Sequence, residues 1–337
     1  MAPEMPNDII LFHYPFSPYA RRIVWYLTLR NIPYAQCLQP PTLPRPTLSS
    51  LGVSYRRIPL LSINSSIYLD TRLILSTLER LFPPSATHPP LSPQASTLLA
   101  PLLSSFTIEG GVFARSAQLI PPSLPLLNDP KFTKDRQDFM GRSWAKEHIL
   151  RARPEAIASM RNLWDVYETT LSDGREWIAG TDGVTLADIE GVWPLVWLGE
   201  LKALDKGLFG EEVYPRTHAW VKRFKTAIAE AEKKHPKAAK AVKVDGEGAV
   251  GFILGKAGRV QQGEVQNDPL ELKKGEEVAV WPIDTGFNHK DKGRLVGLTK
   301  DEVVIAVTTK VDPSKEIEVH APRWGFRIAK VGGQTKL

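Results

Sequence analysis

The sequence predicts an α+β protein of several domains, with an N-terminal βαβ-ββα domain, an all-α bundle domain and a small antiparallel β-rich module. Three observations predict this fold class. The chain has 337 residues, about twice the usual domain size. Short apolar runs alternate with helical patterns up to residue 84, and helical periodicity continues alone from residue 92 to residue 235. After residue 249, Gly, Asp and Asn separate short valine-bearing runs, which is typical of antiparallel strands.

Residues 8–84 have the element order of a compact βαβ-ββα domain. The expected elements are a strand at 8–14, a helix at 18–30, a strand near 34–38, a hairpin of 58–63 and 66–68, and a helix at 71–81. Residues 39–46 are rich in proline, which neither donates to a strand ladder nor continues a helix, so we expect a loop there. Pro83 and Pro84 end the last helix.

The remaining chain divides at residues 236–248, which we predict to be a linker because a stretch rich in Ala and Lys gives way there to glycine. Before the linker, the domain at 92–235 predicts long helical segments near 92–120, 129–172, 185–199 and 214–234. After it, the module at 249–332 predicts brief strands at 251–254, 277–283, 294–298, 303–308 and 316–320. Several runs alternate like half-buried antiparallel strands, so we expect a small β-barrel-like (SH3-like) module.

The composition is that of an ordinary globular protein and argues against several classes. Apolar residues make up 42% and no run of eighteen apolar residues occurs, so we expect no membrane partner. The N-terminus shows no basic segment followed by an apolar one, so we expect a cytoplasmic protein. The net charge of +6 lies partly in five lysines between Lys233 and Lys243. Residues 245–337 hold equal numbers of basic and acidic side chains, which argues against a nucleic-acid partner.

No metal and no nucleotide cofactor is expected. The histidines show no metal-binding spacing such as H-E-x-x-H, and the single cysteine, Cys37, excludes a zinc cluster built from cysteines. The sequence contains neither a G-x-x-x-x-G-K-[ST] phosphate loop nor a dinucleotide-binding glycine motif in the required strand and helix context.

Three segments of the first domain form a pattern of interest. Residues 14–22 read YPFSPYARR, which places Ser17 at the N-cap of the first helix and Pro18 in its first turn. Taken alone, this turn is a helix cap. Residues 57–61 read RIPLL, and the pair Asp70-Thr71 follows eleven residues after the proline.

A fourth segment, residues 183–189, reads GVTLADI and pairs Thr185 with Asp188 as a helix capping box, which we expect to be structural. Together the four segments resemble the glutathione S-transferase family, with a Ser-type, omega-like active-site turn. The resemblance covers residues 8 to about 235 and implies a thioredoxin-like N-terminal domain and a helical C-terminal domain. The tail after residue 249 is similar to an extension of some fungal members.

The resemblance implies a catalytic hydroxyl at Ser17, with Tyr14 and Tyr19 as rivals because some classes of the family use a tyrosine in this region. A thiol with a pKa near 8.5 is only about 3% ionised at pH 7. A hydroxyl donor at the positive end of a helix favours the thiolate of bound glutathione. Since position 17 is not cysteine, a mixed disulfide with glutathione does not form there, and conjugation, isomerisation or elimination fits better than thiol reduction.

Glutathione as co-substrate is expected to contact Arg57, Ile58, Pro59, Asp70 and Thr71. The resemblance implies main-chain pairing at Ile58 before a cis Pro59, and the γ-glutamyl group at Asp70 and Thr71. Arg57 is expected at the glycyl carboxylate. The alternatives stay open: a helix cap at Asp70 and Thr71, an ordinary strand-edge proline and a solvated arginine.

The second substrate is expected to be a small apolar electrophile, bound between the domains by Tyr14, Phe16 and residues 109–113. Trp193 and Trp197 are expected in the core. We expect a homodimer that acts in detoxification or secondary metabolism. The alternative is a non-catalytic interaction protein with the glutathione-transferase fold, which the extra β-rich module favours.

Overall fold

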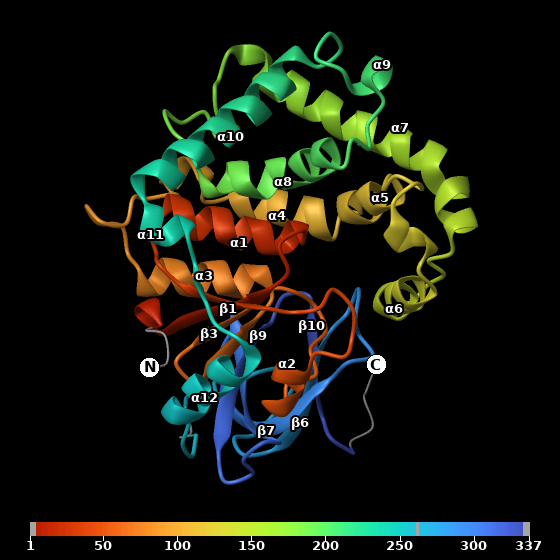
Figure 1. Cartoon of the computed structure of the whole chain (residues 1–337). Coiled ribbons are helices and arrows are strands. Elements are labelled where there is room, and N and C mark those ends of the chain that lie inside the picture. The colour runs from red at the N-terminus through yellow and green to blue at the C-terminus, as the bar shows by residue number, and fades with distance from the viewer. Residues whose placement is uncertain (1–4, 261–262, 333–337) are drawn as a thin grey trace.

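The computed structural model describes residues 5–260 and 263–332 (Figure 1). In that view the helices from the middle of the chain lie at the top, the N-terminal region lies in the centre and the C-terminal strands lie at the bottom. The predicted α+β fold class is confirmed, with a thioredoxin-like N-terminal region, a helical region and an antiparallel C-terminal sheet region.

The N-terminal region has the predicted βαβ-ββα order, with one short helix added. Its elements are β1 (Ile9–His13), α1 (Pro18–Leu29), β2 (Ala35–Leu38), α2 (Pro46–Ser50), β3 (Leu60–Ile63), β4 (Ser66–Leu69) and α3 (Thr71–Leu81). β1 pairs in parallel with β2 and antiparallel with β3. Because β1 is central, all five of its residues are buried, which explains its continuous apolar run IILF.

The helical region is more divided than its periodicity predicts. Its helices are α4 (Leu99–Ile108), α5 (Val112–Gln118), α6 (Pro130–Met140), α7 (Lys146–Thr170), α8 (Leu186–Glu200), α9 (Lys206–Phe209) and α10 (Pro215–Lys234), with short 3-10 turns between some of them. The predicted segments 92–120 and 129–172 are each broken where a glycine adopts positive φ, Gly111 at 87° and Gly141 at 66°. Glycine at these positions ends one helix and turns the chain into the next.

The predicted capping box at the start of α8 is present. The Thr185 N–H and hydroxyl both donate to Asp188 at 2.8 Å, and the buried Asp188 also accepts from the Trp220 indole at 2.9 Å.

Among the described residues no single helix is long and apolar enough to span a membrane, although the bent pair Gln94–Ile108 and Val112–Gln118 passes that test jointly.

The C-terminal region differs from prediction at two places. Its elements are α11 (Pro236–Ala239), β5 (Val242–Lys243), α12 (Gly246–Lys256), β6 (Glu277–Pro282), β7 (Asp291–Leu298), β8 (Glu302–Thr308), β9 (Glu316–Pro322) and β10 (Phe326–Lys330). The strand predicted at 251–254 was wrong, because Asp245 caps a helix there by accepting from the Gly248 N–H at 2.8 Å. The strand β10 was missed. The predicted linker at 236–248 holds α11, β5 and the first turn of α12, and we retain the domain boundaries as a proposal.

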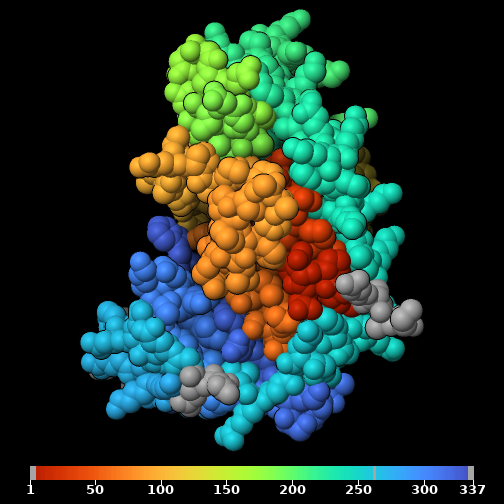
Figure 2. Space-filling view, turned by 90° about the vertical axis from the view of Figure 1, so that its left-hand side faces the viewer, coloured from red at the N-terminus to blue at the C-terminus, as the bar shows by residue number. Residues whose placement is uncertain are grey.

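Within the described residues, one sheet of ten strands runs through both β-regions, in the order β10-β6-β7-β8-β9-β4-β3-β1-β2-β5. The two regions join where β9 pairs in parallel with β4. At this seam His320 stacks on Tyr68, with ring centroids 4.4 Å apart, and hydrogen-bonds Glu302 and Glu318. Figure 2 shows the surface of the C-terminal strands, in blue, adjoining the N-terminal region, in orange and red. The C-terminal strands thus continue the N-terminal sheet.

The apolar core follows the same division. One cluster lies among the helices, where it includes Trp164 and Trp220, and it extends to one face of the N-terminal sheet. A second cluster joins residues of both β-regions, such as Phe12 and Leu60 with Val280 and Ile305. Because apolar side chains of the C-terminal strands share this second core, they hold the N-terminal region from the side opposite the helices.

Candidate active site

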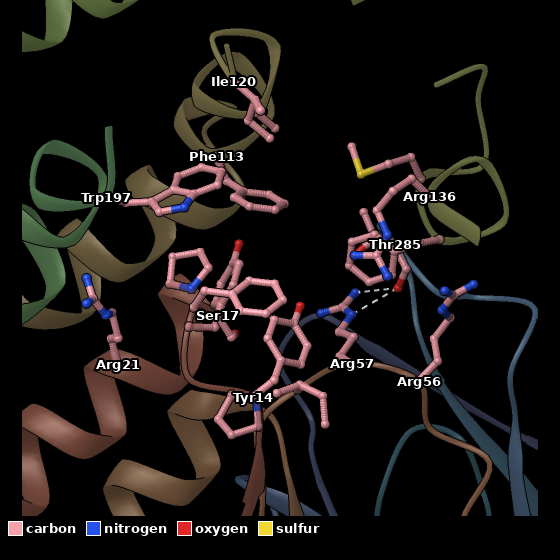
Figure 3. Close-up of a pocket in the computed structure, with 18 of the residues that line it drawn as sticks. Tyr14, Ser17, Arg21, Arg56, Arg57, Phe113, Ile120, Arg136, Trp197 and Thr285 are labelled. Carbon is pink, nitrogen blue, oxygen red and sulfur yellow. Dashed lines mark hydrogen bonds between the residues drawn. The ribbon is translucent and has the colours of Figure 1, made fainter. Parts of the chain in front are cut away.

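A cavity of about 260 Å³ lies where α1, α5, α6 and the segment between β6 and β7 meet (Figure 3). Its volume is near the lower end for small-molecule sites. All seven residues predicted from the sequence line it: Tyr14, Ser17, Arg57, Ile58, Pro59, Asp70 and Thr71. The structure therefore brings together positions that lie up to 57 residues apart in the chain.

Ser17 is the N-cap of α1. Its Oγ accepts a hydrogen bond from the Ala20 N–H at 3.2 Å, and the residue is 2% exposed. The predicted cap is therefore real. A hydroxyl that accepts one hydrogen bond still has its own proton to donate. That proton lies beside the positive end of a twelve-residue helix, a place that favours a negatively charged ligand atom.

Two tyrosines lie near Ser17 in different surroundings. Tyr14 is half-buried on the cavity wall and packs against Phe16, with ring centroids 4.7 Å apart. Tyr19 packs against Phe113 and Trp193, and burial raises the pKa of its hydroxyl far above the ordinary value. Tyr19 therefore stays a neutral phenol, which leaves Tyr14 as the tyrosine that rivals Ser17.

The segment before β3 has the predicted geometry at Pro59. The Ile58–Pro59 peptide bond is cis, as the resemblance implies, and a second cis bond joins Leu43 and Pro44. Ile58 is buried and lines the cavity, directly before the β3 ladder begins at Leu60.

Asp70 and Thr71 begin α3, and both have partners inside the protein. Asp70 has a φ of 65° and caps the helix by accepting from the Arg72 N–H at 3.0 Å. The Thr71 hydroxyl accepts from the guanidinium of Arg22 at 2.9 Å. Arg22 is fully buried and forms an ion pair with Glu190 of α8. The cap expected as an alternative role is thus present, and Thr71 is held by Arg22 of α1, which in turn pairs with Glu190 of the helical region.

Arg57 is not a solvated arginine. Its guanidinium donates to the Thr285 carbonyl at 2.9 and 2.8 Å, which are the dashed lines of Figure 3. It also pairs with Asp284 and lies 3.5 Å from the Asp70 carboxylate. Asp284 and Thr285 belong to the segment between β6 and β7, and sequence reasoning missed them because no local motif joins positions 227 residues apart.

A group of arginines on the same side of the cavity was also missed. Arg45, in the proline-rich segment, is buried and donates to the Pro40 carbonyl at 3.1 Å and to the Arg56 carbonyl. Burial lowers the pKa of Arg45 to about 10. Arg56 and Arg136 both pair with Asp135 of α6, at 2.9 and 2.5 Å. These arginines, paired in part with Asp135 and Asp138, give one side of the cavity a polar wall.

The opposite wall is apolar. It includes Ile108, Phe113, Ala117, Ile120, Leu124, Leu126, Leu127, Trp144, Trp197 and Leu201, while Phe132 and Met140 line the cavity from α6, the helix that carries Arg136. Phe113 was expected there from its position after the glycine pair. Trp193 is buried in the core as predicted, but Trp197 lies in the cavity wall, stacked on Phe113 with centroids 6.1 Å apart. Trp193 and Trp197, about one turn apart on α8, therefore have different surroundings, the core for Trp193 and the cavity for Trp197.

Comparison with known proteins identifies the N-terminal region. Residues 11–86 match the family model for the glutathione S-transferase N-terminal domain. Residues 11–86 therefore form a domain of the glutathione S-transferase N-terminal family. Residues 115–233 match a second model, a domain of unknown function (DUF7962), which covers most of the helical region of this transferase-like chain. A comparison with curated proteins gives no match.

Solved structures share the transferase fold at low sequence identity. A GST-like protein from Pseudomonas syringae is 21% identical, with a TM-score of 0.68, over 96% of this chain and all of that chain. A glutathione S-transferase from Sinorhizobium meliloti is 17% identical, with a TM-score of 0.51, over 67% of this chain and 92% of its own. The first comparison extends through the C-terminal strands, so the whole architecture also occurs in that bacterial protein.

Proposed function

We propose that this chain is a glutathione transferase that stabilises the thiolate of glutathione at Ser17. The thiolate then attacks a small apolar electrophile, in a conjugation, isomerisation or elimination reaction. One observation carries the proposal: the seven predicted residues line a single cavity whose other wall is apolar. A polar side for a charged tripeptide and an apolar side for its acceptor line the same cavity.

Glutathione is proposed to lie along the polar side of the cavity. The Asp70 carboxylate takes its γ-glutamyl ammonium group, and Thr71 with the N-terminus of α3 takes the neighbouring carboxylate. The main chain of Ile58 pairs with the cysteinyl residue as an added strand does. This arrangement directs the sulfur toward Ser17, and Arg57 lies at the glycine end.

The energetic demand on Ser17 is modest. To lower the thiol pKa from about 8.5 to about 6.5 requires roughly 2.7 kcal/mol of preferential stabilisation of the thiolate. A hydrogen bond to a charged group contributes about 1.5–3 kcal/mol, and a helix N-terminus adds about 0.3–1 kcal/mol. The Ser17 hydroxyl and α1 together supply what the reaction needs.

The proposal is tested with Ser17→Ala, with Ser17→Thr as the control that keeps a hydroxyl. At pH 7 the thiolate fraction falls from about 75% to about 3% if the pKa returns to its ordinary value, so activity on an activated aryl halide falls about 25-fold. Ultraviolet absorbance of bound thiolate falls in parallel. Full activity in Ser17→Ala, combined with loss in Tyr14→Phe, would transfer the role to Tyr14.

Calorimetric titration with glutathione separates the enzyme from a non-catalytic interaction protein. Binding that Asp70→Ala weakens supports the enzyme, whereas no binding at millimolar glutathione supports the interaction protein. The resemblance further supports a homodimer and a role in detoxification or secondary metabolism, and the N-terminal sequence supports a cytoplasmic location. Light scattering of the purified protein tests the first of these.

A further inference from the structure

The C-terminal region contributes its own segment to the cavity, residues 283–290 between β6 and β7. The Thr285 carbonyl accepts from Arg57 at 2.9 and 2.8 Å, and the Gly286 N–H donates to the Phe139 carbonyl of α6 at 2.7 Å. His289 contacts Asp138 of α6 at 2.8 Å. The segment is therefore held by both other regions, largely through contacts that do not involve the side chain of Asp284.

Asp284 adds a negative charge at Arg57. The guanidinium of Arg57 pairs with Asp284 and also lies 3.5 Å from Asp70. One cation thus stands between two carboxylates, and these three side chains sum to one negative charge. The Arg57 side chain is only 14% exposed, so water screens the group weakly.

This arrangement changes what Arg57 is able to bind. A free arginine at the glycine end attracts the glycyl carboxylate, but here that carboxylate approaches a cation already neutralised by Asp70 and Asp284. Two carboxylates a few ångströms apart repel each other, the more so at a partly buried site. A ligand of the same shape with an uncharged glycine end avoids this repulsion.

We propose that Asp284 is a specificity-determining residue of the C-terminal region, which disfavours a negatively charged glycine end. The site then prefers γ-glutamyl thiol peptides with an uncharged C-terminal ester or amide over glutathione itself. This inference rests on the proposed function, because it takes the thiol peptide to lie with its glycine end at Arg57.

The test compares two ligands that differ by one charge, glutathione and its glycyl monoethyl ester, by calorimetric titration of the full chain. The wild type binds the ester about tenfold more tightly, less than an unscreened charge pair would give because the Asp284 side chain is 38% exposed. Asp284→Asn binds glutathione about tenfold more tightly than the wild type does, while affinity for the ester changes less than about twofold. Asp284→Glu, which keeps the charge, retains the preference.

The controls separate the possible failures. Glu271→Gln removes one negative charge from the C-terminal region at an exposed position outside the cavity lining, and it leaves the ratio of affinities unchanged. Equal changes for both ligands in Asp284→Asn, or an unchanged ratio, would overturn the role of Asp284 and leave the proposed function standing. Failure of the wild type to bind either ligand would overturn the proposed function, and this inference with it.

Discussion

Asp291 couples the C-terminal strands to the segment that carries Arg57, and its replacement by asparagine tests that coupling. The carboxylate is 1% exposed at the start of β7, and its Oδ1 accepts from the Ser54 and Tyr55 N–H groups at 2.5 and 3.3 Å. Burial raises its pKa to about 7, although the two N–H donors oppose the shift. The asparagine side chain keeps an oxygen acceptor of the same shape and carries no charge.

The sign of the pH effect follows from linkage. In the unfolded chain the carboxyl loses its proton near pH 4, whereas in the folded chain it keeps the proton up to about pH 7. The contribution of this carboxyl group to the free energy of unfolding is therefore fully present below about pH 4 and is lost as the pH rises to about 7. Three pKa units correspond to about 4 kcal/mol, an upper value because local relaxation and water entry lower it.

The assay is urea unfolding of the wild type and Asp291→Asn at pH 5 and pH 8, with Asp301→Asn as an exposed control from the same region. The free energy of unfolding of Asp291→Asn minus that of the wild type is about 1–3 kcal/mol larger at pH 8 than at pH 5. The reason is that only the wild type must bury a charge at pH 8. Equal pH dependence in both proteins, or a gain in the wild type, would refute the reasoning.

Two further predictions concern buried charges. Glu190→Ala leaves Arg22 charged and unpaired beneath Thr71, so the free energy of unfolding falls by about 3–5 kcal/mol in urea titrations, and a loss below about 1 kcal/mol would contradict the buried ion pair. At the β4–β9 seam, burial lowers the pKa of His320, but Glu302 and Glu318 raise it by more, so the pKa of His320 lies above its ordinary value. The stabilising charge is therefore present below about pH 6.5 and lost as the pH rises, so thermal melts of the wild type and His320→Gln converge above neutral pH; a constant difference would exclude a role for the charge.

Features set by neighbouring residues were predictable from the sequence. Ser17 and Pro18 begin α1, and Thr185 and Asp188 form the α8 cap, because each depends on residues within one helical turn. The strand predicted at 251–254 failed for a related reason: an apolar run of that length fits a strand or a helix, and the Asp245 cap decided for the helix.

The sequence by itself determined the βαβ-ββα order of the N-terminal region and the caps of α1 and α8, since periodicity and caps are local properties, and the resemblance carried by its short motifs pointed to the seven residues at the cavity. Only the tertiary structure decided how the C-terminal strands join the rest. The pairing of β9 with β4 and the contact of Asp284 with Arg57 depend on groups more than 200 residues apart. Contacts at such separations follow from the packing of whole sheets and leave no spacing in the chain from which they can be predicted.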